Sequence, residues 1–125
     1  GLARLPSVLA EIKPDVLLLC HGGNDFLQQL SPQATADNIQ AMIDLAQSQG
    51  IQVVLIGVPS FGFFLSPPEF YAELADAAEI PYEGDALSHI LGQRALKSDS
   101  VHPNAAGYRV LAESIASVLQ EAGAI

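Results

Sequence analysis

Two short apolar runs decide the fold class: residues 15–20 read DVLLLC and residues 51–58 read IQVVLIGV. Neither run alternates between apolar and polar residues, so each is typical of a strand that is covered on both faces. Residues 80–82 form a weaker candidate for a third strand. Segments with helical spacing of apolar residues lie before, between and after these runs. This alternation predicts an α/β fold with a parallel sheet and right-handed crossovers.

Start and stop signals mark the helices between the strands. Pro14 ends a first helix, and Ser31 followed by Pro32 is a capping hydroxyl with proline at the first helical position. Gly50 closes that second helix. Asn104 is expected to cap the final helix, so the segment just before it approaches the same edge of the sheet as the strand ends.

Amino-acid composition limits the classes of protein to which this chain can belong. The chain has 125 residues, of which 50% are hydrophobic and 15% are charged, which predicts a single folded unit rather than disorder. A net charge of −9 with five Lys and Arg residues argues against nucleic acid and anionic membrane as partners. No membrane span is expected, because no stretch reaches about 18–20 apolar residues. Cys20 is the single cysteine and is expected to be buried.

The first chemistry-bearing segment is Gly22-Gly23-Asn24-Asp25, directly after a predicted strand. Glycines allow a tight turn and a close approach to a ligand, so Gly23 is a candidate substrate contact. The side-chain amide of Asn24 can donate a hydrogen bond to a developing oxyanion. The alternative is an ordinary strand-to-helix turn, since Gly, Asn and Asp are common turn formers.

The second segment is Asp99-Ser100-Val101-His102, just before the predicted final helix. Asp99 and His102 are three residues apart and can meet on one side of a turn. The carboxylate can then orient the imidazole, whose other ring nitrogen serves as a general base. The alternative is that Asp99 only caps the turn and His102 is an ordinary surface residue.

Together and in this order, the two segments resemble the SGNH, or GDSL-like, hydrolase family, which includes bacterial thioesterase I/lysophospholipase-type enzymes and arylesterases. The resemblance implies a flavodoxin-like three-layer α/β/α fold, with residues 1–125 as the C-terminal portion of one domain that lacks its first two strands. It also implies a serine esterase or thioesterase with a Ser-His-Asp triad. By resemblance, Asn24 is an oxyanion-hole donor, His102 the general base and acid, and Asp99 the residue that orients His102.

The family's nucleophile block, Gly-Asp-Ser, does not occur in the 125 residues. Ser60 lacks the surrounding glycines of a nucleophile elbow, and Ser100 lies on the same turn as the acid and base. We therefore expect the nucleophile in an N-terminal segment of the same protein, outside this sequence. Without that segment, the strand at residues 15–20 would be an exposed edge of the sheet, and these 125 residues alone are expected to be inactive.

The loop after the second strand is unusually apolar and contains Phe61 and Phe63. Its functional interpretation is a wall that binds an acyl or aryl group, and its alternative is packing against the core. No cofactor is required by the implied reaction. No metal site is expected either, because His21, His89 and His102 lack the spacing of metal ligands.

Two alternatives to the esterase hypothesis stay open. One is a carbohydrate O-acetyl esterase, and the other is a non-catalytic fragment or binding module that keeps the fold, because a fold alone does not establish activity. Besides the N-terminal segment, the expected partner is a small acyl-ester or thioester substrate. The sequence leaves the location open, although the family suggests a periplasmic or secreted protein.

Overall fold

A computed structural model describes residues 2–23, 25, 31–60 and 66–123. These residues form one parallel sheet with strands in the order β1 (Val16–Cys20), β2 (Gln52–Ile56) and β3 (Tyr82–Glu83). Within the β1–β2 pair, Cys20 lies opposite Ile56, so the two strands end level with each other. The α/β fold with a parallel sheet, predicted from the alternation of elements, is confirmed.

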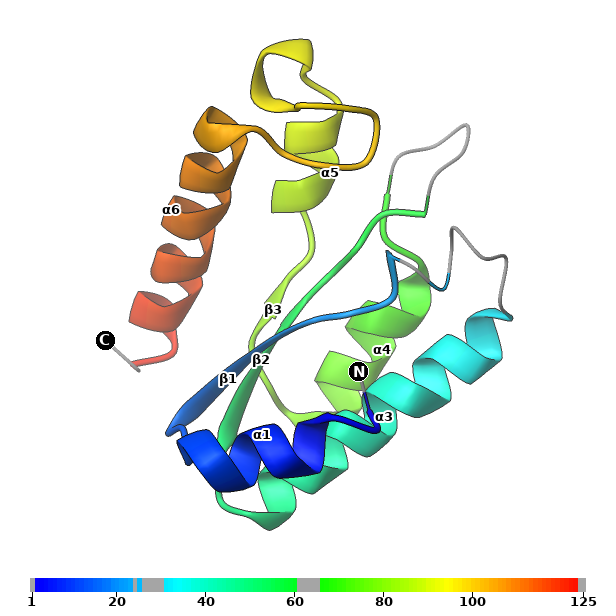
Figure 1. Ribbon diagram of the computed structural model, residues 1–125, viewed down its shortest axis with the longest axis vertical. Coiled ribbons are helices and arrows are strands. Elements are labelled where there is room, and N and C mark those ends of the chain that lie inside the picture. The colour runs from blue at the N-terminus through cyan, green and yellow to red at the C-terminus, as the bar shows by residue number, and fades with distance from the viewer. Residues whose placement is uncertain (1, 24, 26–30, 61–65, 124–125) are drawn as a thin grey trace.

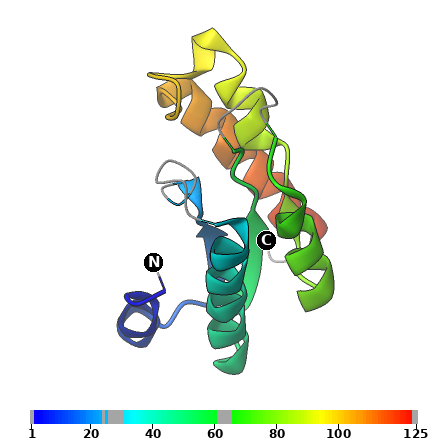
Figure 2. The ribbon, with the colours of Figure 1, turned by 90° about the vertical axis from the view of Figure 1, so that its right-hand side faces the viewer.

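Helices cover both faces of this sheet. In Figure 1, α3 and α4 lie on one side of the strands and α6 on the other, and Figure 2 shows α3 and α4 from the front. The first helix contacts α3. The three layers thus match the predicted α/β/α architecture. The helices are α1 (Leu5–Ile12), α3 (Pro32–Ser48), α4 (Glu69–Ala78), α5 (Ala86–Leu91) and α6 (Ala105–Glu121), with a 3₁₀ turn η1 (Arg94–Leu96) before α6.

Two polar caps begin the long helices as predicted. The Ser31 hydroxyl accepts a hydrogen bond from the backbone N–H of Ala34 at 3.1 Å, and Pro32 follows it at the first position of α3. The Asn104 side chain accepts the N–H of Gly107 at 2.9 Å at the start of α6. Each cap satisfies an N–H group that a helix start leaves without a partner.

The core lies between the sheet and the helices α1, α3 and α4. Its fully buried side chains include aliphatic residues of α1, α3 and β2 and one tyrosine of α4: Leu9, Ile39, Ile43, Leu55 and Tyr71. Burial of such side chains removes apolar area from water and supplies most of the folding free energy. The last helix is less deeply packed, with Leu111 and Ile115 only partly buried against this core.

The strand β1 lies at an edge of the described sheet, where β2 is its paired neighbour. Leu18 is 44% exposed, and Cys20 is exposed as well. The expectation that Cys20 is buried is therefore wrong: Leu18 and Cys20 alternate with Leu19 and share a face of β1 that is open to solvent. Leu19 is the one buried residue of this strand.

Two elements differ from the predictions. The third strand covers Tyr82–Glu83 rather than residues 80–82. The helix α5 occupies a stretch in which the sequence predicts no regular element, and its Leu87, Ile90 and Leu91 are buried. Within the described parts of the chain, no helix is both long enough and apolar enough to cross a bilayer.

Candidate active site

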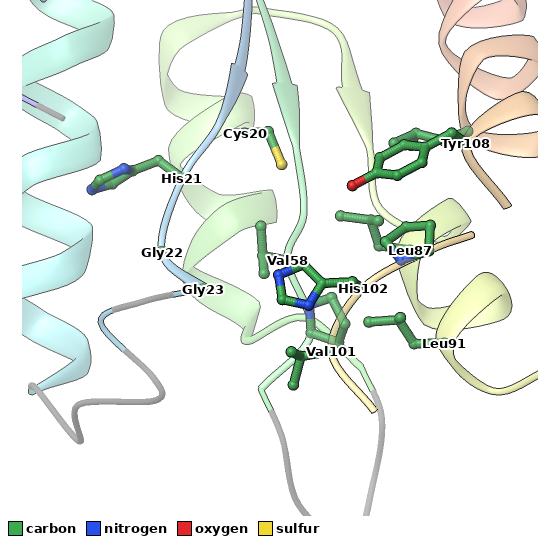
Figure 3. A pocket seen from close by; sticks show the side chains of 13 residues that line it. Cys20, His21, Gly22, Gly23, Val58, Leu87, Leu91, Val101, His102 and Tyr108 are labelled. Carbon is green, nitrogen blue, oxygen red and sulfur yellow. The ribbon is translucent and has the colours of Figure 1, made fainter. Parts of the chain in front are cut away.

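One cavity of about 320 Å³ lies where β1 and β2 end and the segment before α6 approaches them. Ligands of open parallel sheets bind at this edge. Figure 3 shows the imidazole of His102 projecting into the cavity on the side of Gly22 and Gly23. The described residues that line it come from both strand ends, α5, α6 and the segment before α6: Cys20, His21, Gly22, Gly23, Val58, Pro59, Leu87, Leu91, Val101, His102, Pro103, Tyr108 and Leu111.

Asp99 and His102 meet as the sequence predicts. The ring nitrogen Nδ1 of His102 lies 3.0 Å from both carboxylate oxygens of Asp99. The Oδ1 atom also accepts the backbone N–H groups of Val101 at 2.8 Å and of His102 at 2.9 Å. The carboxylate therefore shapes the turn and orients the imidazole at the same time, which leaves Nε2 as the ring nitrogen that faces away from the acid.

These hydrogen bonds favour the ionised form of Asp99. The backbone N–H of Val101 is the main group that lowers the pKa of the Asp99 carboxyl, followed by the His102 side chain. Both side chains of the pair are largely exposed, 61% for His102 and 57% for Asp99. An ionised carboxylate at Nδ1 favours the tautomer in which Nδ1 carries the proton and Nε2 can accept one.

The turn is fixed to the 3₁₀ helix and to α6 by backbone and side-chain contacts. The N–H of Asn104 donates to the carbonyl of Leu96 at 2.9 Å, and its side chain donates to the carbonyl of Ala95 at the same distance. Gly107 packs so closely that an added Cβ would lie 2.1 Å from the Leu96 carbonyl oxygen. Asn104 thus caps α6 and anchors the residues that precede the Asp99–His102 pair.

At the end of β1, Gly22 adopts φ +122° and is buried, a conformation that favours glycine. Gly23 lines the cavity, as expected for a candidate substrate contact. Asn24, Phe61 and Phe63, the expected oxyanion donor and the two expected aromatic substrate contacts, lie outside the described residues. Of the two serines weighed as nucleophiles, Ser60 and Ser100, neither is among the described residues that line the cavity.

Part of the apolar wall was not predicted from the sequence. Leu87 and Leu91 of α5 and Tyr108 of α6 line the cavity opposite the end of β1. The spacing of Leu87, Ile90 and Leu91 is the helical signal by which this wall was detectable. Among the described residues, no group of three or more His, Cys, Asp or Glu side chains is placed to hold a metal ion.

Comparison with known proteins assigns the family. A family model described as GDSL-like Lipase/Acylhydrolase family matches residues 1–110. The chain belongs to this family. The resemblance drawn from the Gly-x-Asn-Asp and Asp-x-x-His blocks is therefore confirmed, and the GDSL-like family accounts for nearly the whole chain.

Individual relatives agree with the family assignment. The esterase TesA of Pseudomonas aeruginosa is 30% identical over 123 residues, which cover 92% of this chain and 60% of the relative. An arylesterase of Vibrio mimicus is 30% identical over 125 residues, which cover 95% of this chain and 62% of the relative. The chain thus spans about three fifths of the length of these relatives.

A solved structure supports the fold as well. The crystal structure of TesA superposes with a TM-score of 0.76 at 29% identity, covering 97% of this chain and 71% of that one. The GDSL-like relatives named above are esterases by name. Carboxylic ester hydrolysis is therefore the reaction class of the proteins that this chain resembles.

Proposed function

We propose that the protein containing this chain is a serine esterase or thioesterase in which Asp99 and His102 are the acid and base of a Ser-His-Asp triad. The observation that carries the proposal is the Asp99–His102 pair, held at 3.0 Å on the edge of the sheet where Gly22 and Gly23 also lie. A carboxylate on one ring nitrogen and an open cavity beside the imidazole are the arrangement that general base catalysis requires.

In the proposed reaction, His102 takes the proton of a serine hydroxyl through Nε2 while the serine oxygen attacks the acyl carbonyl carbon. Asn24, together with backbone or Gly donors outside this chain, donates hydrogen bonds to the oxyanion that forms. The tetrahedral intermediate expels the alcohol or thiol, which takes the proton from His102. Water then attacks the acyl-enzyme in the same way and releases the carboxylic acid.

The nucleophilic serine in this proposal belongs to a segment of the full protein that precedes residue 1. Supporting this, the 125 residues contain no Gly-Asp-Ser block, while the matched relatives are longer than the chain. Accordingly, we expect no esterase turnover from the 125 residues alone. A fluorophosphonate probe on the full-length protein should label a serine before residue 1, and labelling of Ser60 or Ser100 instead would contradict this assignment.

The substrate is an acyl ester or thioester with an apolar group near the reacting carbonyl. Leu87, Leu91 and Val58 give the described cavity an apolar wall beside His102, which suits an acyl or aryl group better than a sugar ring. We propose Gly23, Phe61 and Phe63 as further substrate contacts. No cofactor takes part in this reaction.

The decisive experiment is hydrolysis of p-nitrophenyl esters by the full-length protein and its His102→Ala variant. We expect the variant to lose at least about 10³-fold in kcat, because both the proton acceptor and the proton donor are removed. His89→Ala is the matched control, since His89 is exposed on α5 and does not line the cavity. Full activity of His102→Ala would refute the triad.

A further inference from the structure

The chain just beyond β1 is hydrogen-bonded to a buried tyrosine that lies 50 residues away in the sequence. The hydroxyl of Tyr71, on α4, donates a hydrogen bond to the backbone carbonyl of His21 at 2.5 Å. The tyrosine side chain is fully buried, with 0% of its surface exposed. A buried hydroxyl that is bonded to main chain restrains the segment it touches, because breaking the contact would leave two polar atoms without partners.

The same hydroxyl also reaches the end of β2. A hydrogen bond from the backbone of Val58 opposes the increase in the Tyr71 pKa that burial causes. His21 and Val58 lie one and two residues beyond the paired Cys20 and Ile56. Tyr71 therefore joins the two strand ends at the point where both enter the cavity wall, and burial keeps its hydroxyl protonated and able to donate.

The absence of a side chain at Gly22 leaves room for this contact. A Cβ at position 22 would lie 2.2 Å from the Tyr71 hydroxyl oxygen and 3.4 Å from the Cγ2 methyl of Thr35. The glycine thus lets the main chain pass directly over the tyrosine at φ +122°. This close approach accounts for the first glycine of the Gly22-Gly23 pair, while Gly23 faces the cavity.

A second buried hydroxyl holds the next described residue of the loop. Thr35 of α3 is 0% exposed, and its hydroxyl lies 2.8 Å from a carboxylate oxygen of Asp25 and 3.4 Å from the carbonyl of Ser31. A threonine hydroxyl has one hydrogen to donate, and the shorter contact to the carboxylate is the stronger one. Tyr71 therefore contacts the main chain at His21, and Thr35 contacts the side chain of Asp25.

We propose that Tyr71, assisted by Thr35, is a positioning residue: Tyr71 fixes the main chain at His21 and Gly22, and Thr35 fixes the side chain of Asp25, beside the cavity containing His102. The inference rests on the proposed function, in which position 24 supplies an oxyanion donor. Oxyanion donors act because their position is fixed before the reaction begins. Neither hydroxyl contacts the reacting atoms in this proposal; each acts through the loop that it holds.

The test uses the full-length protein and a Tyr71→Phe variant, with p-nitrophenyl ester kinetics and hydrogen–deuterium exchange measured on both. We expect kcat to fall by about 10- to 100-fold, since a small misplacement of a catalytic group has effects of this size, while KM changes less than about threefold. Amide exchange in the peptide covering residues 20–26 should rise by about three- to tenfold, with α6 unchanged.

Matched variants separate positioning from general stability. Tyr82→Phe removes the hydroxyl of a different, half-buried tyrosine, which lies against Gly57 and Gly84, and should leave both readouts near those of the parent. Thr35→Val should lower kcat and raise exchange at residues 20–26, whereas Thr35→Ser keeps the hydroxyl and should restore both. This pair decides the matter even if Tyr71→Phe does not fold.

The outcomes distinguish the two proposals. A folded parent protein without ester hydrolysis refutes the proposed function. An active parent whose Tyr71→Phe and Thr35→Val variants keep normal kcat and normal exchange at residues 20–26 refutes only the positioning role. Faster exchange spread evenly over the whole chain, including α6, also refutes it, because the tyrosine would then be a purely structural residue.

Discussion

Asp99 holds His102 by side chain and main chain together: both carboxylate oxygens lie 3.0 Å from Nδ1, and Oδ1 accepts the backbone N–H of His102 at 2.9 Å. The orientation of the imidazole and the shape of the turn therefore depend on one carboxylate. Substitutions at position 99 can separate these two roles, because an amide keeps the oxygen that the main chain uses but replaces the other oxygen with a donor.

Asp99→Asn is expected to lower kcat of the full-length protein by about 10²- to 10⁴-fold, because the amide favours the wrong imidazole tautomer. The amide oxygen still accepts the N–H groups of Val101 and His102, so the thermal midpoint should change little. Asp76→Asn, an exposed site on α4, controls for the loss of one charge. Activity of Asp99→Asn within twofold of the parent would show that the acid does not set the tautomer.

Acid titration provides a second test of the pair. The pKa of the Asp99 carboxyl is lowered from its usual value of 3.8 by the backbone N–H of Val101 and by His102. Since the folded pKa is the lower one, the contribution of this carboxylate to stability is present above the unfolded pKa and is lost as pH falls through the folded pKa. The ¹³C shift of the Asp99 carboxyl should therefore inflect below pH 3.8. In His102→Ala the inflection should move upward, and an inflection above 3.8 in the parent would contradict the geometry.

The strands and the contact between Asp99 and His102 were predictable because their signals are local. Two apolar runs mark β1 and β2, and Asp99 and His102 are close in sequence. The burial of Cys20 was wrongly predicted, because burial of a strand residue depends on what packs against its face of the sheet and not on the run that contains it. The contact from Tyr71 to His21 had no sequence signal at all, because it joins residues 50 positions apart.

The polar caps of α3 and α6 should respond differently to substitution. Asn104→Ala removes the bonds to Gly107 and to the Ala95 carbonyl and should cost about 0.5–2 kcal/mol of unfolding free energy. It should also reduce kcat, because the turn with His102 loses an anchor. Ser31→Ala removes only the bond to Ala34 and should cost a comparable free energy without lowering kcat. Urea unfolding and ester kinetics on both variants check this, and equal kcat values for the two would count against the anchoring role of Asn104.

For Gly107→Ala, the sign of the change in unfolding free energy tests how α6 packs. Helix propensity alone favours alanine over glycine by about 1 kcal/mol inside a helix. At this position an added Cβ would meet the Leu96 carbonyl oxygen at 2.1 Å and Ile90 Cγ2 at 2.9 Å. We therefore expect Gly107→Ala to lower the unfolding free energy by about 1–3 kcal/mol, measured by urea titration. A gain in stability would mean that α6 does not pack on the 3₁₀ turn as described.

The short separation of Asp99 and His102 in the sequence determines which contact of the site is lost first on heating. Two side chains separated by only two residues stay at a high effective concentration relative to each other in any conformation of the rest of the chain, because closing so short a loop costs little entropy. His21 and Tyr71, by contrast, meet only when α4 is docked on the sheet. On heating, the contact between Asp99 and His102 should therefore persist after the contact between His21 and Tyr71 has broken. Activity should then decline because the loop is misplaced, while His102 is still oriented by Asp99.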